Sequence, residues 1–365
     1  MYPLAGHIAR NGTIFCLKHL AGVELNRKGA LHYMSEYRFD PFQNRWVIIS
    51  EERSRRPTDF SQTEKKKCPF CRGNESLAPP EITAVRKKPG SFPDWTVRVV
   101  PNKFPAVQKS ISSGTEFSPA GIPYIRNKGQ GFHEVIIETP VHEVDLGELP
   151  SSHIAEVLRI YGERIKKLSR AAGIKFILVF KNHGRSAGAS LSHAHSQLIA
   201  TRIIPKQIEN QLHSMKNYQR EKDRCLLCDI VKKEIKQEKR LIFQEKGFAA
   251  FCPFASRFPY EIIITPVNHY AEFFSLSSAE YEVLAGFLKT ILKKIRRNLN
   301  NPDYNYVLHT LPYLKNGLKN PEKEYYHWYL DLFPRLSSPA GFEWGSGLHI
   351  NTVSPESAAS RIRDS

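Results

Sequence analysis

The sequence has few cysteines, no long apolar run and no excess of acidic residues. Six cysteines in 365 residues are too few for a disulfide-stabilised scaffold. No window approaches the roughly 18 consecutive apolar residues of a membrane-spanning helix, and the N-terminus lacks the apolar core of a secretory signal. We therefore expect a cytoplasmic protein that is neither secreted nor bound to a membrane.

Positive charge is abundant instead. Lys and Arg number 53 against 36 Asp and Glu, which gives a formal net charge of +17. Such a surface attracts polyanions, whether nucleic acid, anionic lipid or phosphorylated metabolites. Hydrophobic residues make up 41% of the chain and charged residues 24%, as in an ordinary globular protein. The length favours two domains or one duplicated unit.

Short strand-like runs alternate with two amphipathic helical patterns, which predicts an α+β fold. The helices are expected at about 152–171 and 278–298, whereas residues 206–240 are polar and basic. Strand-like runs begin near Trp46 with WVIIS and continue through TVRVV, HEVIIETP, KFILVFKN and HSQLIATRII. Residues 1–36 show no clear period, and we expect a flexible extension or upstream sequence from too early a start codon.

The landmarks of the chain recur in the same order. Each half holds a C-x-x-C motif, a strand that ends in Thr-Pro and a His, a helix, and a later His before a final strand. Unequal offsets between matching landmarks are explained by insertions in loops. The pattern predicts an internal duplication, with domains at 37–205 and 206–365.

Each half thereby offers two thiolates and two imidazoles, a donor set that suits tetrahedral Zn²⁺ in a closed, structural site. A single C-x-x-C could be a redox dithiol, but its repetition with the same partners favours metal. The first set, the stronger prediction, is Cys68, Cys71, His142 and His193. The second is Cys225, Cys228, His269 and His327, in which His309 or His349 could replace His327.

The segment NHGRSAGASLSHAHSQLIA combines small residues, a hydroxyl and imidazoles, as a phosphate-handling loop requires. His193, His195 and Gln197 alternate, so a strand would place them on one face. One imidazole would bind zinc, and the other would be free to attack phosphorus. Aligning His327 with His193 sets Tyr329 opposite His195, which predicts one active site per chain because a phenol is a poor nucleophile at neutral pH.

These motifs resemble the galactose-1-phosphate uridylyltransferase family, a branch of the histidine-triad superfamily that includes plant-type ADP-glucose phosphorylase-like relatives. The resemblance covers roughly residues 37–363 and rests on CPFCRGNE, VRVVPNKFPAV, HEVIIETPVH, FKNHGRSAGASLSHAHSQ and AGFEWGSGLHINTVSPESAA. It implies two histidine-triad-like halves, each a mostly antiparallel sheet flanked by helices, and a homodimer.

The resemblance also implies a reaction and its residues. His195 would attack the α-phosphorus of a nucleoside diphosphate sugar such as UDP-glucose, and the nucleotidyl group would pass to a hexose 1-phosphate. Gln197 and Ser190 would hydrogen-bond the phosphoryl oxygens. The implied substrate contacts are Asn102 and Asn182 at nucleotide and phosphate, Gly188 in the small-residue loop, Arg53 and Arg56 from across a dimer interface, and Glu343 at the sugar.

Three alternatives remain. The run HAHSQ lacks the Pro and Gly of the commonest uridylyltransferases, and two C-x-x-C pairs resemble the ADP-glucose phosphorylases, so adenylyl transfer to phosphate is the main one. A hydrolase is less favoured, because Gln197 replaces a third His that could protonate a basic leaving group. A basic zinc-containing nucleic-acid-binding protein would explain the charge but not ASLSHAHSQ.

Overall fold

The computed structural model describes residues 23–25, 31–33, 35–56, 67–86, 94–109, 115–117, 124–142, 144–313 and 320–364. Most of the expected extension, residues 1–36, lies outside these ranges, apart from the paired strands β1 (Val23–Leu25) and β2 (Leu31–Tyr33) and residues 35 and 36. None of the helices within the described ranges is long and apolar enough to cross a membrane.

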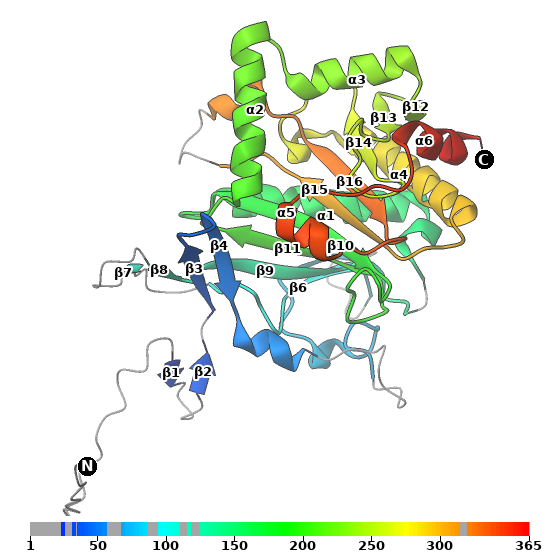
Figure 1. Ribbon diagram of the computed structural model, residues 1–365. Coiled ribbons are helices and arrows are strands. Elements are labelled where there is room, and N and C mark those ends of the chain that lie inside the picture. Colours follow the sequence, from blue (N-terminus) through cyan, green and yellow to red (C-terminus); the bar gives the residue numbers. More distant parts are fainter. Residues whose placement is uncertain are drawn as a thin grey trace, which may run out of the picture.

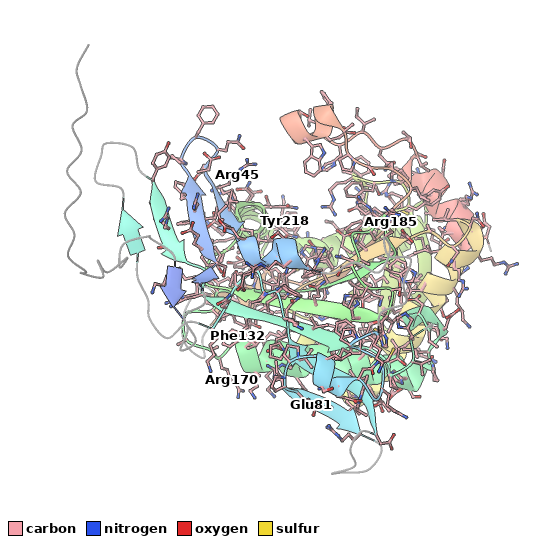
Figure 2. The ribbon with its side chains drawn as sticks, turned by 90° about the horizontal axis from the view of Figure 1, so that it is seen from below. Arg45, Glu81, Phe132, Arg170, Arg185 and Tyr218 are labelled. Carbon is pink, nitrogen blue, oxygen red and sulfur yellow. The ribbon has the colours of Figure 1, made fainter. Side chains whose placement is uncertain are left out.

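A ten-stranded antiparallel sheet forms the centre of the molecule (Figure 1). Its order is β12-β13-β14-β16-β15-β10-β11-β9-β6-β5. In chain order the strands are β5 (Thr83–Arg86), β6 (Trp95–Pro101), β9 (Gly131–Ile137), β10 (Phe176–His183), β11 (His195–Thr201), β12 (Leu241–Glu245), β13 (Phe248–Phe251), β14 (Ile262–Pro266), β15 (Tyr304–His309) and β16 (Tyr329–Pro334). At one end of the sheet, Glu81 (Figure 2) precedes β5 and accepts hydrogen bonds from Arg86 and Arg98.

The strand order repeats outward from the middle of this sheet. β10 pairs with β15 at the centre, with Phe180 opposite Val307. From there the first half runs β10, β11, β9, β6, β5, and the second runs β15, β16, β14, β13, β12. The predicted α+β fold with two matching antiparallel halves is confirmed. The exact domain boundary at 205/206 stays a prediction.

Helices α1 (Ser151–Leu168) and α4 (Ser278–Asn298) pack on each other and on the sheet, close to their predicted positions. Each helix buries an apolar stripe at helical spacing, which explains why the sequence pattern located both. Helix α4 begins at a capping box between Ser277 and Glu280, which satisfies backbone groups of its first turn.

Two further helices, α2 (Lys206–Lys222) and α3 (Leu226–Gln237), occupy the stretch that the sequence marked only as polar and basic. Helix α3 packs Leu227 and Val231 against Ala249 and Phe251 of β13, on the face of the sheet opposite α4. Its few buried apolar residues lie among many charged ones, so the sequence pattern alone does not predict a helix here.

A smaller four-stranded sheet leads into the first half. Its order is β4-β3-β8-β7, formed by β3 (Glu36–Asp40), β4 (Arg45–Ile49), β7 (Thr115–Phe117) and β8 (Ile125–Lys128). The Tyr37 hydroxyl donates to the Gln130 carbonyl at 3.0 Å, just before β9. A short helical turn, η1 (Glu51–Arg55), follows β4 and carries Arg53.

Candidate active site

A cavity of about 160 Å³ lies over β11, β9 and β6, on the face of the sheet away from α1 and α4. Its polar lining consists of His195 and Gln197 of β11 together with Ser190, Arg56 and Asn102. The remaining wall is mostly apolar and consists of Pro69, Phe70, Leu77, Ala78, Pro79, Val100, Pro101, Lys103, Phe104, Val135 and Leu191. Apolar walls with a few convergent polar groups are typical of sites for nucleotides and other small molecules.

The geometry of His195 fixes its tautomer. Its Nδ1 lies 2.7 Å from the carbonyl oxygen of His193, so Nδ1–H donates and Nε2 keeps the unshared electron pair. The side chain is only 6% exposed. Burial lowers the pKa of His195 to about 4, and the nearby cations Lys181 and Arg56 contribute to the decrease. The imidazole is therefore neutral at neutral pH.

Gln197 is held by two side chains from neighbouring segments. Its Oε1 lies 3.0 Å from Nε2 of His133 on β9 and 3.4 Å from Nδ2 of Asn102, which follows β6. The Asn102 Oδ1 in turn accepts a hydrogen bond from the Phe104 amide at 2.8 Å. These contacts with His133 and Asn102 hold the side-chain amide of Gln197 in one position beside the cavity.

Four residues that the resemblance assigned to substrate do not line this cavity. Arg53 donates to the Phe104 carbonyl at 2.9 Å, and Asn182 accepts from Asn305 Nδ2 at 2.8 Å. Gly188 has a positive φ in the turn after β10, in the loop that carries Arg185 (Figure 2), and Glu343 is half-buried in α5 (Gly341–Ser346). Arg56, in contrast, lines the cavity of its own chain.

The sequence reasoning did not identify Phe70, Phe104 or His133 as parts of the site. Phe70 stands between the two cysteines of the first C-x-x-C, and its ring meets that of His195 edge-on at 5.3 Å. His133 is the first residue of the HEVIIETP run and is buried in the structure. A polar residue at the start of an otherwise apolar strand was the only sign of it in the sequence.

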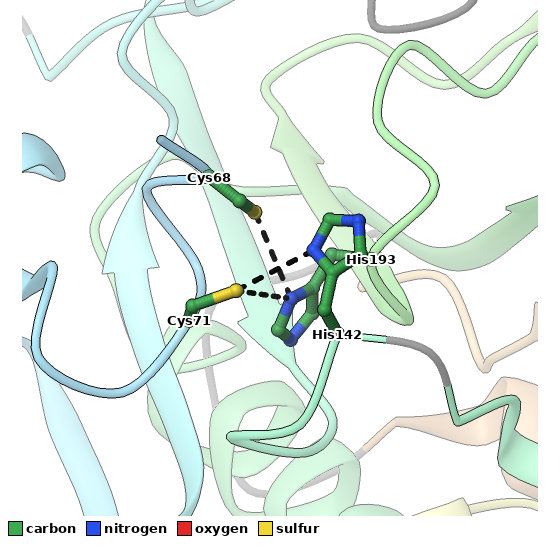
Figure 3. Close-up of side chains that lie close together, drawn as sticks. All are labelled: Cys68, Cys71, His142 and His193. Carbon is green, nitrogen blue, oxygen red and sulfur yellow. Dashed lines mark hydrogen bonds between the residues drawn. The ribbon is translucent and has the colours of Figure 1, made fainter. Parts of the chain in front are cut away.

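The first Cys₂His₂ set converges, as Figure 3 shows. The Cys71 Sγ lies 3.4 Å from His142 Nδ1 and 3.6 Å from His193 Nδ1, and the Cys68 Sγ lies 3.7 Å from His193 Nδ1. A tetrahedral Zn²⁺ with usual bond lengths holds sulfur and nitrogen ligands about 3.5 Å apart. His193 Nε2 donates to the Thr139 carbonyl at 2.7 Å, which leaves Nδ1 for a metal. The donor set fits.

The second set converges in the same way. Cys228 Sγ lies 3.4 Å from His269 Nδ1 and 3.3 Å from His327 Nδ1, and Cys225 completes the group. The structure selects His327 over the two alternatives, because the His309 ring stacks on Tyr329 and the His349 ring packs on Phe258. Both halves therefore hold Cys/His groups able to bind a metal ion.

A buried polar network supports β11 from the helix side. Lys181 Nζ lies 2.6 Å from Glu138 Oε2, and both side chains are fully buried. Ser196, between His195 and Gln197, bonds to Glu138 and to Tyr161 of α1. The Tyr161 hydroxyl meets that of Tyr306 on β15 at 2.6 Å, which connects the two halves. A satisfied network of this kind restricts the motion of the strand that carries the candidate nucleophile.

Comparison with known families supports the same class of protein. The family model for the N-terminal domain of galactose-1-phosphate uridyl transferase matches residues 26–205, and a model described as a domain of unknown function matches residues 143–365. The ADP-glucose phosphorylase of Arabidopsis thaliana is 38% identical over 338 residues, covering 90% of this chain and 92% of that protein. The galactose-1-phosphate uridylyltransferase of Thermotoga maritima is 28% identical over 339 residues, covering 91% and 98%.

Solved structures agree. The crystal structure of an ADP-glucose phosphorylase from Arabidopsis thaliana with bound ADP-glucose is 37% identical, with a TM-score of 0.71, covering 91% of this chain and 99% of that one. A uridylyltransferase structure is 28% identical, with a TM-score of 0.74, covering 90% and 97%. These relatives are nucleotidyltransferases that act on sugar phosphates, and this chain is an enzyme of that class. It belongs to the galactose-1-phosphate uridylyltransferase family.

Proposed function

We propose that the protein transfers a nucleotidyl group from a nucleoside diphosphate sugar to a phosphate acceptor through a covalent intermediate on His195. One observation carries this proposal. The His193 carbonyl holds the Nδ1 proton of His195, so the Nε2 electron pair is available to a substrate in the cavity. A neutral, oriented imidazole is a competent nucleophile toward phosphorus.

In the first step Nε2 attacks the α-phosphorus. A P–N bond forms, the bond to the bridging oxygen breaks, and the hexose 1-phosphate leaves with the electron pair. The attacking ring becomes an imidazolium, whose Nδ1–H keeps its hydrogen bond to the His193 carbonyl. A sugar phosphate is a good leaving group, so the site needs no acid where Gln197 stands.

In the second step an acceptor phosphate oxygen attacks the same phosphorus and the P–N bond breaks. Gln197, Ser190 and Arg56 supply donors around the cavity that hold the charged phosphoryl oxygens through both steps. Asn102 would contact the nucleotide, as the resemblance implies. Asn182 and Gly188 would shape the loop that carries Ser190 without touching the phosphate directly.

The donor we propose first is UDP-glucose, with hexose 1-phosphate as acceptor, in galactose metabolism. A second candidate is adenylyl transfer from ADP-glucose to inorganic phosphate. The identity of 38% to the Arabidopsis thaliana ADP-glucose phosphorylase favours this second reaction, against 28% to the Thermotoga maritima uridylyltransferase. The apolar cavity wall suits either base, because it offers stacking surface in preference to polar side chains.

The cofactor we propose is Zn²⁺, held by Cys68, Cys71, His142 and His193, and in the second half by Cys225, Cys228, His269 and His327. Bound there, zinc would supply structural cross-linking of strands, because four protein ligands leave no position for substrate. In the first half the backbone of His193 would then hold His195 in place.

A cytoplasmic homodimer completes the proposal. Phe342 and Trp344 are 56% and 78% exposed in α5, which supports a partner surface there. Glu343 of the same helix would contact the sugar, as the resemblance implies. The cysteines of both clusters are free thiols, as metal ligands in a reducing compartment are.

Mass spectrometry of the protein mixed with UDP-glucose or ADP-glucose tests the proposal. We expect a uridylyl or adenylyl adduct on His195, and its disappearance on adding the matching acceptor. The base that forms the adduct decides between the two candidates. An adduct on another residue, or none with either donor, contradicts the assignment of His195.

A further inference from the structure

We propose that His133 is a positioning residue, which fixes the Gln197 amide so that its NH₂ group and not its carbonyl faces the substrate phosphate. The inference rests on the proposed function, because it requires the phosphoryl oxygens to lie beside Gln197. It also gives a role to Arg53, which does not line the cavity.

The sheet register sets His133 and Gln197 side by side. Gln197 pairs with Val135 across β11 and β9, so His133 is its diagonal neighbour on the same face of the sheet. His133 is 4% exposed and Gln197 is 6% exposed. The His133 Nε2 lies 3.0 Å from Gln197 Oε1, within hydrogen-bond distance.

The proton on His133 is located by its backbone partner. The Ala106 amide donates to His133 Nδ1 at 3.0 Å, so this nitrogen holds an electron pair. A neutral imidazole then carries its single proton on Nε2, which lies 3.0 Å from Gln197 Oε1 and 3.1 Å from Asn102 Nδ2. Of these two atoms only the Gln197 oxygen can accept the proton. Burial keeps the ring neutral by lowering the pKa of His133 to about 4, and the charges of Arg53 and Arg56 add to the decrease.

Arg53 reinforces this arrangement from behind. Its guanidinium lies 3.5 Å from His133 Nδ1 and donates to the Phe104 carbonyl at 2.9 Å. The positive charge opposes a second proton on the ring, and the bond to Phe104 secures the segment whose Ala106 amide meets Nδ1.

Gln197 Oε1 therefore receives donors from two sides. The second is Asn102 Nδ2 at 3.4 Å, whose own Oδ1 is held by the Phe104 amide. Turning the Gln197 amide over would set its NH₂ group against two other donors. The observed orientation leaves that NH₂ group for the cavity, where phosphoryl oxygens can only accept hydrogen bonds.

Two substitutions at His133 separate its two nitrogens. In His133→Asn the side-chain amide reaches the place of Nδ1, so the Ala106 amide keeps an acceptor but Gln197 loses its donor. In His133→Gln the amide reaches the place of Nε2, so a donor to Gln197 remains. The matched pair distinguishes positioning of Gln197 from general support of the fold.

The readout is the single-turnover rate of nucleotidylation of His195, with UDP-glucose and ADP-glucose each as donor. We expect His133→Asn to lower this rate about tenfold or more while the dissociation constant of the donor changes only a few-fold, and His133→Gln to restore it to within about threefold. In a Gln197→Ala background, adding His133→Asn should have little further effect. A wild-type rate for His133→Asn, or an equal loss in both backgrounds, overturns the inference.

A third variant keeps the inference testable if His133→Asn does not fold. Gln197→Glu retains an oxygen toward His133 but replaces the cavity-facing NH₂ with a second oxygen. We expect it to lose at least as much rate as Gln197→Ala, and a wild-type rate for Gln197→Glu overturns the inference. Failure of the proposed function looks different, since the wild-type protein would then form no adduct on His195.

Discussion

The two halves of the sheet share their strand order and a Cys₂His₂ cluster, yet they differ in what lies on the face of the sheet away from α1 and α4. After Cys71 the chain forms a turn and a short helical segment, η3 (Glu75–Leu77), and Leu77 lines the cavity. After Cys225 the chain enters α3, whose Leu227 and Val231 cover Ala249 and Phe251. A cavity lies where the C-x-x-C motif leads into a loop, and a helix covers β13 where the motif leads into α3.

The two matching strands, β11 and β16, also carry different side chains at the positions of the candidate catalytic residues. Tyr329 and Asp331 of β16 stand where β11 has His195 and Gln197. The Tyr329 hydroxyl accepts from Gln211 of α2 at 2.8 Å, and its ring stacks on His309 at 4.4 Å. Burial raises the pKa of Tyr329 further above its usual range, which makes the phenol a poorer nucleophile. Both halves have the Cys₂His₂ donor set, while the groups suited to attack on phosphorus stand in one.

Replacing the nucleophile gives the largest expected difference between the halves. We expect His195→Asn to lower the rate of nucleotidyl transfer by at least about 10⁴-fold, because no other side chain can form the intermediate. Tyr329→Phe, the matched change in the second half, should leave the rate within about twofold. Steady-state exchange between the nucleotide sugar and labelled hexose 1-phosphate measures both. Loss of exchange in Tyr329→Phe would contradict the view that the second half is a scaffold.

Much of this comparison could be predicted from the sequence, because its signals are local or repeated. The two C-x-x-C motifs, the Thr-Pro-x-x-His or Thr-Pro-x-His strand ends and the alternation of His193 and His195 lie within short segments. Helices α1 and α4 follow from apolar residues at regular spacing.

The rest depends on contacts between distant segments. Helix α3 buries few apolar residues among many charged ones, so its covering of β13 is visible only once the sheet is assembled. His133 and Gln197 are 64 residues apart and meet through strand register. The displacement of Arg53 from the cavity follows from its bond to the Phe104 carbonyl, which no short motif encodes.

Removing a metal ligand should affect stability in both halves and catalysis in one. We expect Cys68→Ser and Cys225→Ser each to lose the metal of their own cluster and about 3 kcal/mol or more of unfolding free energy, or about 6–12 °C in Tm. Only Cys68→Ser should also slow nucleotidylation, since the His193 backbone holds His195. Metal analysis and calorimetry on both variants test this. Unchanged metal content in either variant would remove its cluster from the proposal.

The same Val→Ala substitution should cost more stability beneath the α3 contact in the second half than beside the cavity in the first. Val231 of α3 is fully buried against β13, whereas Val135 is 5% exposed and borders the cavity. We expect Val231→Ala to cost about 2 kcal/mol of unfolding free energy and Val135→Ala about 1 kcal/mol, because the second enlarges a space that already exists. Denaturant unfolding of the two variants measures the difference. Equal costs would mean that the cavity is filled by neighbouring groups in solution.

A last expected difference is a pH dependence that Asp331 gives to the second half. Burial raises the pKa of the Asp331 carboxyl to about 7, and the nearby Glu261 adds to the rise against the opposing Arg257. A carboxyl with a raised pKa in the folded state stabilises the fold below its unfolded pKa of about 4, and this contribution is lost as the pH rises through 7.

The Asp331→Asn variant tests this pH dependence, because its amide is uncharged, like the protonated carboxyl, at every pH. Relative to wild type, it should therefore gain about 2–3 kcal/mol of unfolding free energy between pH 5 and pH 8. Tyr329→Phe serves as the control and should run parallel to wild type over this range, because its phenol stays protonated. The matching position on β11 is the uncharged Gln197, so the first half has no corresponding step. If the difference in unfolding free energy between Asp331→Asn and wild type stays constant with pH, Arg257 keeps Asp331 ionised at pH 5. The second half would then contain a stable ion pair in place of a protonated carboxyl.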